Sequence, residues 1–173
     1  MRALLVLAVA TALFAGHAHG AALSPCKGGA LKGSFAVVPG SAGAGNIVYA
    51  LRLRNVSPTA CTVSGLPDVR LLDRRHRVLP THAVAAHPGQ LTAVLVRLAP
   101  GRWTSASARF SPDVPGPGEP VSRRRCEPTA YAMRIRAPGR GMAVVPIRPP
   151  TPVCEHGGMQ LSAYVLGRTP PGA

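Results

Sequence analysis

The chain shows its clearest strand pattern at residues 47–54, which read IVYALRLR. Ile47, Tyr49, Leu51 and Leu53 hold the odd positions, and both arginines of the stretch hold even positions. This period of two predicts a β-strand with one core face and one wetter face. Outward from it, further short segments read as strands: 30–38, 69–73, 91–98, 103–110, 131–136, 142–147 and 159–165.

Turn residues separate these segments. Gly and Pro contribute 19 residues each to a chain of 173, which favours turns and disfavours long helices. Short strands at regular spacing predict an all-β fold, an antiparallel β-sandwich of about eight or nine strands. We expect a single sandwich domain over 21–168 and a flexible tail over 169–173.

The first twenty residues are predicted to be a secretory signal peptide. Arg2 precedes an uncharged apolar run over 3–16, and 18–20 read AHG, with small residues at the two positions that a signal peptidase reads. A membrane anchor is disfavoured because the run is shorter than the ~20 residues that span a bilayer. We expect cleavage near Gly20 and a secreted, periplasmic or cell-envelope location.

Lipid attachment is the alternative mode of export, because residues 23–26 read LSPC. Pro25 stands directly before Cys26, where a small residue such as Gly or Ala is wanted, and Cys26 lies well beyond the apolar run. Acylation of Cys26 would also leave an odd number of cysteines in an oxidising compartment. We therefore expect no lipid there.

The four cysteines are Cys26, Cys61, Cys126 and Cys154. No two of them form a C-x-x-C pair, which argues against a zinc site. An even number of cysteines behind a signal peptide predicts disulfides, with three possible pairings for four cysteines. We favour Cys26–Cys61 and Cys126–Cys154, because each bond closes a loop at one end of the domain.

Arginine dominates the charge of the chain. Lys and Arg outnumber Asp and Glu by 20 to 6, and only Lys27 and Lys32 are lysines. Guanidinium groups bind phosphate and carboxylate in a bidentate way, so an exported basic domain can dock on anionic envelope polymers or lipid headgroups. Alternatively, arginine is abundant because of the base composition of the genome and only keeps the surface soluble. The near absence of lysine favours this alternative. The candidate anion-binding residues, in two predicted loops, are Arg74, Arg75, Arg77, Arg123, Arg124 and Arg125.

Other function classes are less well supported. One Trp, three Tyr and three Phe offer few platforms for base stacking, so sequence-specific nucleic-acid binding is not expected. The chain lacks the G-x-S-x-G elbow of a serine hydrolase, and its six carboxylates lie in predicted turns or beside Arg, Pro or His. We expect a non-enzymatic protein without catalytic residues or a cofactor.

His156 and Met159 give the alternative function. Imidazole and thioether ligands suit Cu(I), and exported β-sandwich proteins carry copper. Met159 equally fits the apolar face of the last predicted strand, where it would fill the core. We therefore expect no metal site and keep Cu(I) binding as the alternative.

An ordered series of short motifs runs along the chain: Cys26; Asn55-Val56-Ser57 before Cys61; Gly65-Leu66-Pro67; Val69-Arg70-Leu71-Leu72-Asp73; Leu98-Ala99-Pro100-Gly101; Cys126 with Pro128; Pro138-Gly139; and Cys154. In this order the motifs resemble the bacterial family called domain of unknown function 4232, over about residues 26–166. The resemblance implies an exported, often envelope-associated, Ig-like sandwich with no assigned activity. It brings no catalytic residues.

Overall fold

The computed structural model describes residues 22–43, 46–89, 95–122, 125–126 and 128–172. The predicted signal peptide, residues 1–20, lies outside this part of the chain, so cleavage near Gly20 stays a prediction. None of the helical segments among the described residues has the length and apolar character needed to cross a bilayer.

The described chain is built of β-strands, as predicted. They are β1 (Leu31–Val37), β2 (Ile47–Asn55), β3 (Cys61–Ser64), β4 (Asp68–Leu72), β5 (His82–Ala85), β6 (Leu95–Leu98), β7 (Trp103–Phe110), β8 (Val121–Ser122), β9 (Arg125–Cys126), β10 (Thr129–Arg136), β11 (Met142–Pro152), β12 (Gly158–Leu161) and β13 (Val165–Leu166). Two short 3-10 turns, η1 (Gly28–Ala30) and η2 (Glu155–Gly157), accompany them. The prediction of about eight or nine strands missed β3, β5, β8 and β9, because strands of two to four residues are too short to show a period.

Nine of the strands form one mixed sheet. Its order is β4-β10-β11-β1-β2-β7-β12-β5, and β13 also pairs with β7; β3 pairs with β6, and β8 with β9, in two small sheets. The prediction of a purely antiparallel sheet is wrong at two places, since β1 runs parallel to β11 and β5 runs parallel to β12. Each parallel pair joins segments far apart in sequence, and local alternation carries no information about such a partner.

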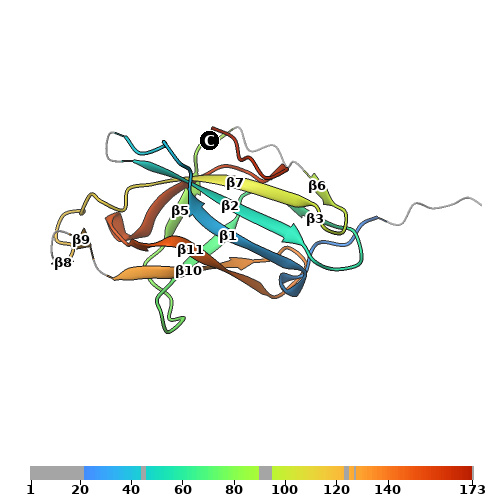
Figure 1. Ribbon diagram of the computed structural model, residues 1–173, viewed down its shortest axis with the longest axis horizontal. Helices are drawn as coiled ribbons and strands as arrows, with labels where there is room; N and C mark the ends of the chain where they lie inside the picture. The colour runs from blue at the N-terminus through green and yellow to red at the C-terminus, as the bar shows by residue number, and fades with distance from the viewer. Residues whose placement is uncertain (1–21, 44–45, 90–94, 123–124, 127, 173) are drawn as a thin grey trace, which may run out of the picture.

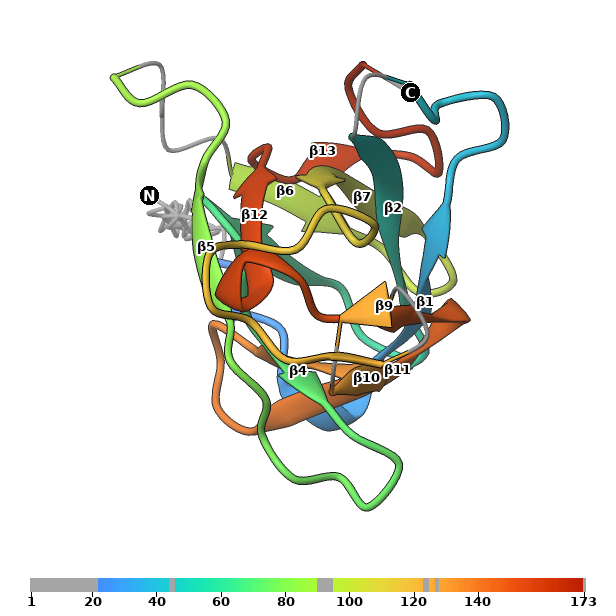
Figure 2. The ribbon, with the colours of Figure 1, turned by 90° about the vertical axis from the view of Figure 1, so that its left-hand side faces the viewer.

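The two edges of the large sheet nearly meet, so the sheet curls into a barrel-like body in place of the predicted two-layer sandwich. The edge strands β4 and β5 follow one another in the chain; in Figure 2, β5 lies at the left and β4 in the lower middle. Between them, the Leu79 N–H donates to Leu71 O at 2.9 Å, and the Leu71 N–H donates to Thr81 Oγ1 at 2.9 Å. The loop over residues 73–77, which follows β4, projects from the body at the bottom of Figures 1 and 2.

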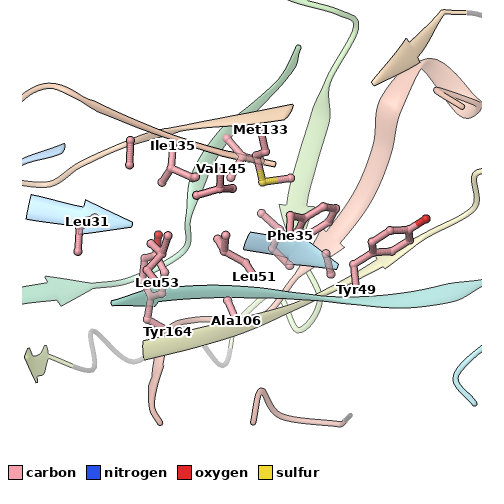
Figure 3. Close-up of a cluster of buried hydrophobic side chains, with 14 of the residues drawn as sticks. Leu31, Phe35, Tyr49, Leu51, Leu53, Ala106, Met133, Ile135, Val145 and Tyr164 are labelled. Carbon is pink, nitrogen blue, oxygen red and sulfur yellow. The ribbon is translucent and has the colours of Figure 1, made fainter. Parts of the chain in front are cut away.

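The core fills the inside of this curled sheet. Side chains from β10 and β11, among them Met133 and Val145, point toward Leu51 of β2 in Figure 3. Phe35 of β1 stacks on Tyr49 with ring centroids 4.9 Å apart. The odd positions of 47–54 thus face the core, as the alternation predicts.

Candidate anion-binding surface

Both predicted disulfides are present. Cys26 is bonded to Cys61 and Cys126 to Cys154, and the described residues contain no free cysteine. All four cysteines are buried, so the bonds are structural links rather than exposed reactive groups.

Asp73 organises the first predicted arginine loop. Its Oδ1 accepts the N–H groups of Arg75 at 2.8 Å and Arg77 at 2.9 Å, and its Oδ2 accepts the Arg77 Nε–H at 2.6 Å. Desolvation raises the pKa of Asp73, but the hydrogen bonds and charge of Arg77 and the N–H of Arg75 lower it more, leaving it below its ordinary value. Arg77 is therefore partly neutralised within the loop.

The other two arginines of this loop are less engaged. Arg74 lies over the Tyr131 ring, with its Cζ 4.7 Å from the centroid, and its Nη2 donates to the Tyr131 hydroxyl at 3.1 Å. Arg75 is exposed, and its side chain has no partner among the described residues. Stacking on an aromatic ring leaves N–H edges of a guanidinium available to an anion.

The second predicted arginine cluster is only partly described. Arg123 and Arg124 lie outside the described residues, and of Arg125 the structure describes the backbone alone, in β9. Their anion-binding role stays a prediction.

The structure adds three arginines that the loop clusters did not include. Arg70 of β4 is the register partner of Arg134 of β10, and Asp68 is the partner of Arg136. Asp68, Arg70, Arg134 and Arg136, together with Met142, line a hollow of about 50 Å³. We call Arg70, Arg134 and Arg136 the β4–β10 strip. The alternation over 131–136 places Arg134 and Arg136 on one face, but only the pairing with β4 shows that Arg70 joins them.

Asp68 is the carboxylate that pairs with arginines of this strip. Asp68 Oδ2 accepts the Arg136 Nε–H at 2.8 Å, and Asp68 Oδ1 lies 3.4 Å from Arg70 Nη1. All three side chains are about half exposed or more, so these pairs stabilise the fold by at most about 1 kcal/mol. Arg134 makes no ion pair within the described residues, and the strip keeps an excess of positive charge.

The alternative metal residues, His156 and Met159, lie in different environments. The His156 side chain is 73% exposed, with Nδ1 3.4 Å from Glu119 Oε1. Met159 is 3% exposed and belongs to the hydrophobic core. No group of three or more His, Cys, Asp or Glu side chains suited to a metal occurs in the described part of the chain. This placement favours core packing as the role of Met159.

Glu119 is a buried carboxylate that the sequence analysis did not single out. Its side chain is 4% exposed. It accepts the N–H groups of Gly116 at 2.6 Å and Glu155 at 2.7 Å, and also that of His156. Desolvation raises its pKa, but these three hydrogen bonds and the nearby His156 lower it more, so the pKa lies below its ordinary value. Glu119 thereby fastens residues 116–119 to η2, beside the Cys126–Cys154 disulfide.

Fold and surface together define a class: an all-β domain closed by two disulfides, with arginine-rich surfaces. The chain matches the family model described as Domain of unknown function (DUF4232) over residues 26–164 and belongs to that family. The resemblance seen in the motif series is therefore confirmed. No curated protein and no solved structure gives a significant match.

Proposed function

We propose that this chain is an exported, non-enzymatic protein that binds anionic groups of the cell envelope through the β4–β10 strip and the neighbouring Arg74 and Arg75. Export is supported by the two buried disulfides, which persist in oxidising compartments. A non-enzymatic role is supported by the carboxylates of Asp68, Asp73 and Glu119, which all accept structural hydrogen bonds.

The pairing of Arg70 with Arg134 is the observation that carries the binding proposal. Two like charges directly opposite one another on neighbouring strands destabilise a sheet. Here Asp68 pairs with Arg70 and Arg136, while Arg134 makes no ion pair within the described residues. An anion placed across both guanidinium groups relieves this repulsion through charge-assisted hydrogen bonds. The facing arginines cost the free protein some stability, and they are well placed to bind repeated phosphate or carboxylate groups.

The double variant Arg70→Ala/Arg134→Ala is expected to bind anionic surfaces more weakly by about 2 kcal/mol at low salt, since each basic residue near such a surface contributes about 1 kcal/mol. Binding is measured by co-sedimentation with vesicles of phosphatidylcholine and phosphatidylglycerol, and in parallel by heparin affinity, so that a lipid and a polymer are compared. Wild-type binding should be lost at about 0.5 M salt, where the Debye length is ~4 Å.

The matched control is Arg97→Ala/Arg109→Ala, which removes two exposed arginines on β6 and β7. It changes the net charge equally and should retain most of the binding. If both double variants lose equal affinity, overall charge and not the strip is responsible. Binding that survives high salt unchanged would also contradict the proposal.

Copper binding is not the function we propose, because Met159 is packed in the core. In a competitive Cu(I) titration under reducing conditions, His156→Ala and the wild type should show the same affinity. His17 and His19 belong to the predicted signal peptide, so the mature chain starting at Ala21 is the protein to titrate. A substantially weaker affinity of His156→Ala would restore the copper hypothesis.

A further inference from the structure

A second basic pocket surrounds Trp103, the single tryptophan of the chain. It lies where β7 begins and β13 ends. A cavity of about 260 Å³ is lined by Gly101, Arg102, Trp103, Leu166, Gly167 and Arg168. The lining offers an indole ring, an aliphatic side chain that is 58% exposed, and two arginines, with no carboxylate among its residues. We call this the Trp103 pocket.

One of its guanidinium groups is held in place by the indole. Arg168 lies over the Trp103 ring, with its Cζ 4.6 Å from the centroid. A stacked guanidinium keeps its charge and its N–H edges while it loses much of its freedom to rotate. The contact favours this placement of Arg168 over its other rotamers, which lowers the entropy lost when a ligand binds there.

The backbone of the pocket is braced by two further arginines. Arg52 Nε donates to Arg168 O at 2.8 Å, and Arg54 Nε donates to Gly101 O at 3.0 Å. The Gly167 N–H donates to Trp103 O at 2.8 Å. These bonds fix both walls of the pocket to β2 and β7. A surface hollow that combines an apolar wall with a small number of fixed polar groups can serve as a small-molecule site.

We propose that the Trp103 pocket binds a small ring compound that carries a carboxylate or a phosphate. Arg102 and Arg168 hold the oxyanion by charge-assisted hydrogen bonds, and the ring packs against Leu166 and the part of the Trp103 side chain that Arg168 does not cover. The cavity volume lies just below the ~300–1,000 Å³ of ordinary ligand pockets, which fits a single ring better than a polymer chain. This ligand class differs from the anionic surface proposed for the β4–β10 strip and does not depend on it.

The test uses Trp103 itself as the reporter. Cyclohexanecarboxylate and phenyl phosphate are titrated into the oxidised protein at fixed ionic strength, followed by tryptophan emission and by calorimetry. Acetate and inorganic phosphate supply the oxyanion without the ring, and cyclohexanol supplies the ring without charge. We expect saturable binding of one or both ring-bearing oxyanions, and binding at least about tenfold weaker for each of the other three compounds.

Single variants locate the site. Arg102→Ala and Arg168→Ala should each weaken binding by about tenfold or more, since a hydrogen bond to a charged group is lost. Arg134→Ala, which removes the same charge from the β4–β10 strip, should bind as the wild type does. Circular dichroism checks that each variant is folded, and Arg102→Ala leaves the Arg168–Trp103 stack intact. The proposal is overturned if neither method detects saturable binding, or if Arg134→Ala weakens it as much as Arg102→Ala.

Discussion

Replacing all four cysteines with alanine is expected to lower the free energy of unfolding by about 7 kcal/mol. The bonds close loops with sequence separations of 35 and 28 residues, and in the chain-entropy account each loop of this size contributes about 3–4 kcal/mol. A loss of that size is comparable with the about 5–15 kcal/mol that holds a typical domain folded. The variant should therefore be largely unfolded at 37 °C, as checked by urea denaturation followed by circular dichroism.

The two disulfides join different parts of the fold, so removing one bond at a time measures the contribution of each. Cys26–Cys61 joins the chain before β1 to β3, where the Cys26 N–H also donates to Thr62 O at 2.8 Å. Cys126–Cys154 joins β9 to the segment before η2. Each double alanine variant should lose about half of the total. Dithiothreitol should destabilise the wild type but leave the quadruple variant unchanged. Free thiols in the native protein, or a wild type insensitive to reductant, would contradict the prediction and remove the main support for export.

Glu119→Ala is expected to destabilise the fold by about 2–4 kcal/mol, because three backbone N–H groups lose their shared acceptor and unsatisfied donors cost about 1–3 kcal/mol each when water cannot replace the acceptor. Water reaches Glu155 and His156, which are exposed, so the sum over three full penalties is not expected. Urea unfolding at neutral pH measures the loss. Glu155→Gln is the matched control, since it removes an exposed carboxylate beside the site and should change stability by less than about 0.5 kcal/mol.

The same carboxylate predicts an acid dependence. The pKa of Glu119 is lower in the folded protein than its ordinary value of 4.5. Its stabilising contribution is therefore complete above the unfolded pKa and is lost as the pH falls through the folded pKa. Asp73 acts in the same direction from an ordinary value of 3.8. The wild type should lose stability below about pH 4.5, and Glu119→Gln should show a shallower slope there. Equal slopes in the two proteins would mean that Glu119 is not the titrating group.

Much of the strand assignment could be predicted from the local alternation of apolar and polar residues. The predicted segment 103–110 coincides with β7, and 47–54 lies within β2. Both disulfide pairs were also favoured correctly, on the ground that each bond closes a loop at one end of the domain. Alternation involves only a few consecutive residues, and each disulfide closes one continuous stretch of chain. Both features can therefore be predicted from the sequence.

The composition of the two proposed binding surfaces could not be predicted in this way. The arginines within 74–77 were predicted to bind anions. In the structure, Arg77 is partly neutralised by Asp73 and Arg74 lies on the Tyr131 ring. Arg70 and Arg134 are 64 residues apart in sequence and were not predicted as binding residues, yet the pairing of β4 with β10 places them opposite each other. The Trp103 pocket likewise joins the start of β7 to the chain after β13.

The sequence established the strand-rich character of the chain, the core face of β2 and the family, because each depends on residue type and spacing along the chain. It favoured one of three disulfide pairings, which the structure then confirmed. Tertiary structure alone decided the mixed, nearly closed sheet and the partners of each arginine. Those features depend on which strands lie side by side, and that choice is made by the burial of all the apolar faces together rather than by any one segment.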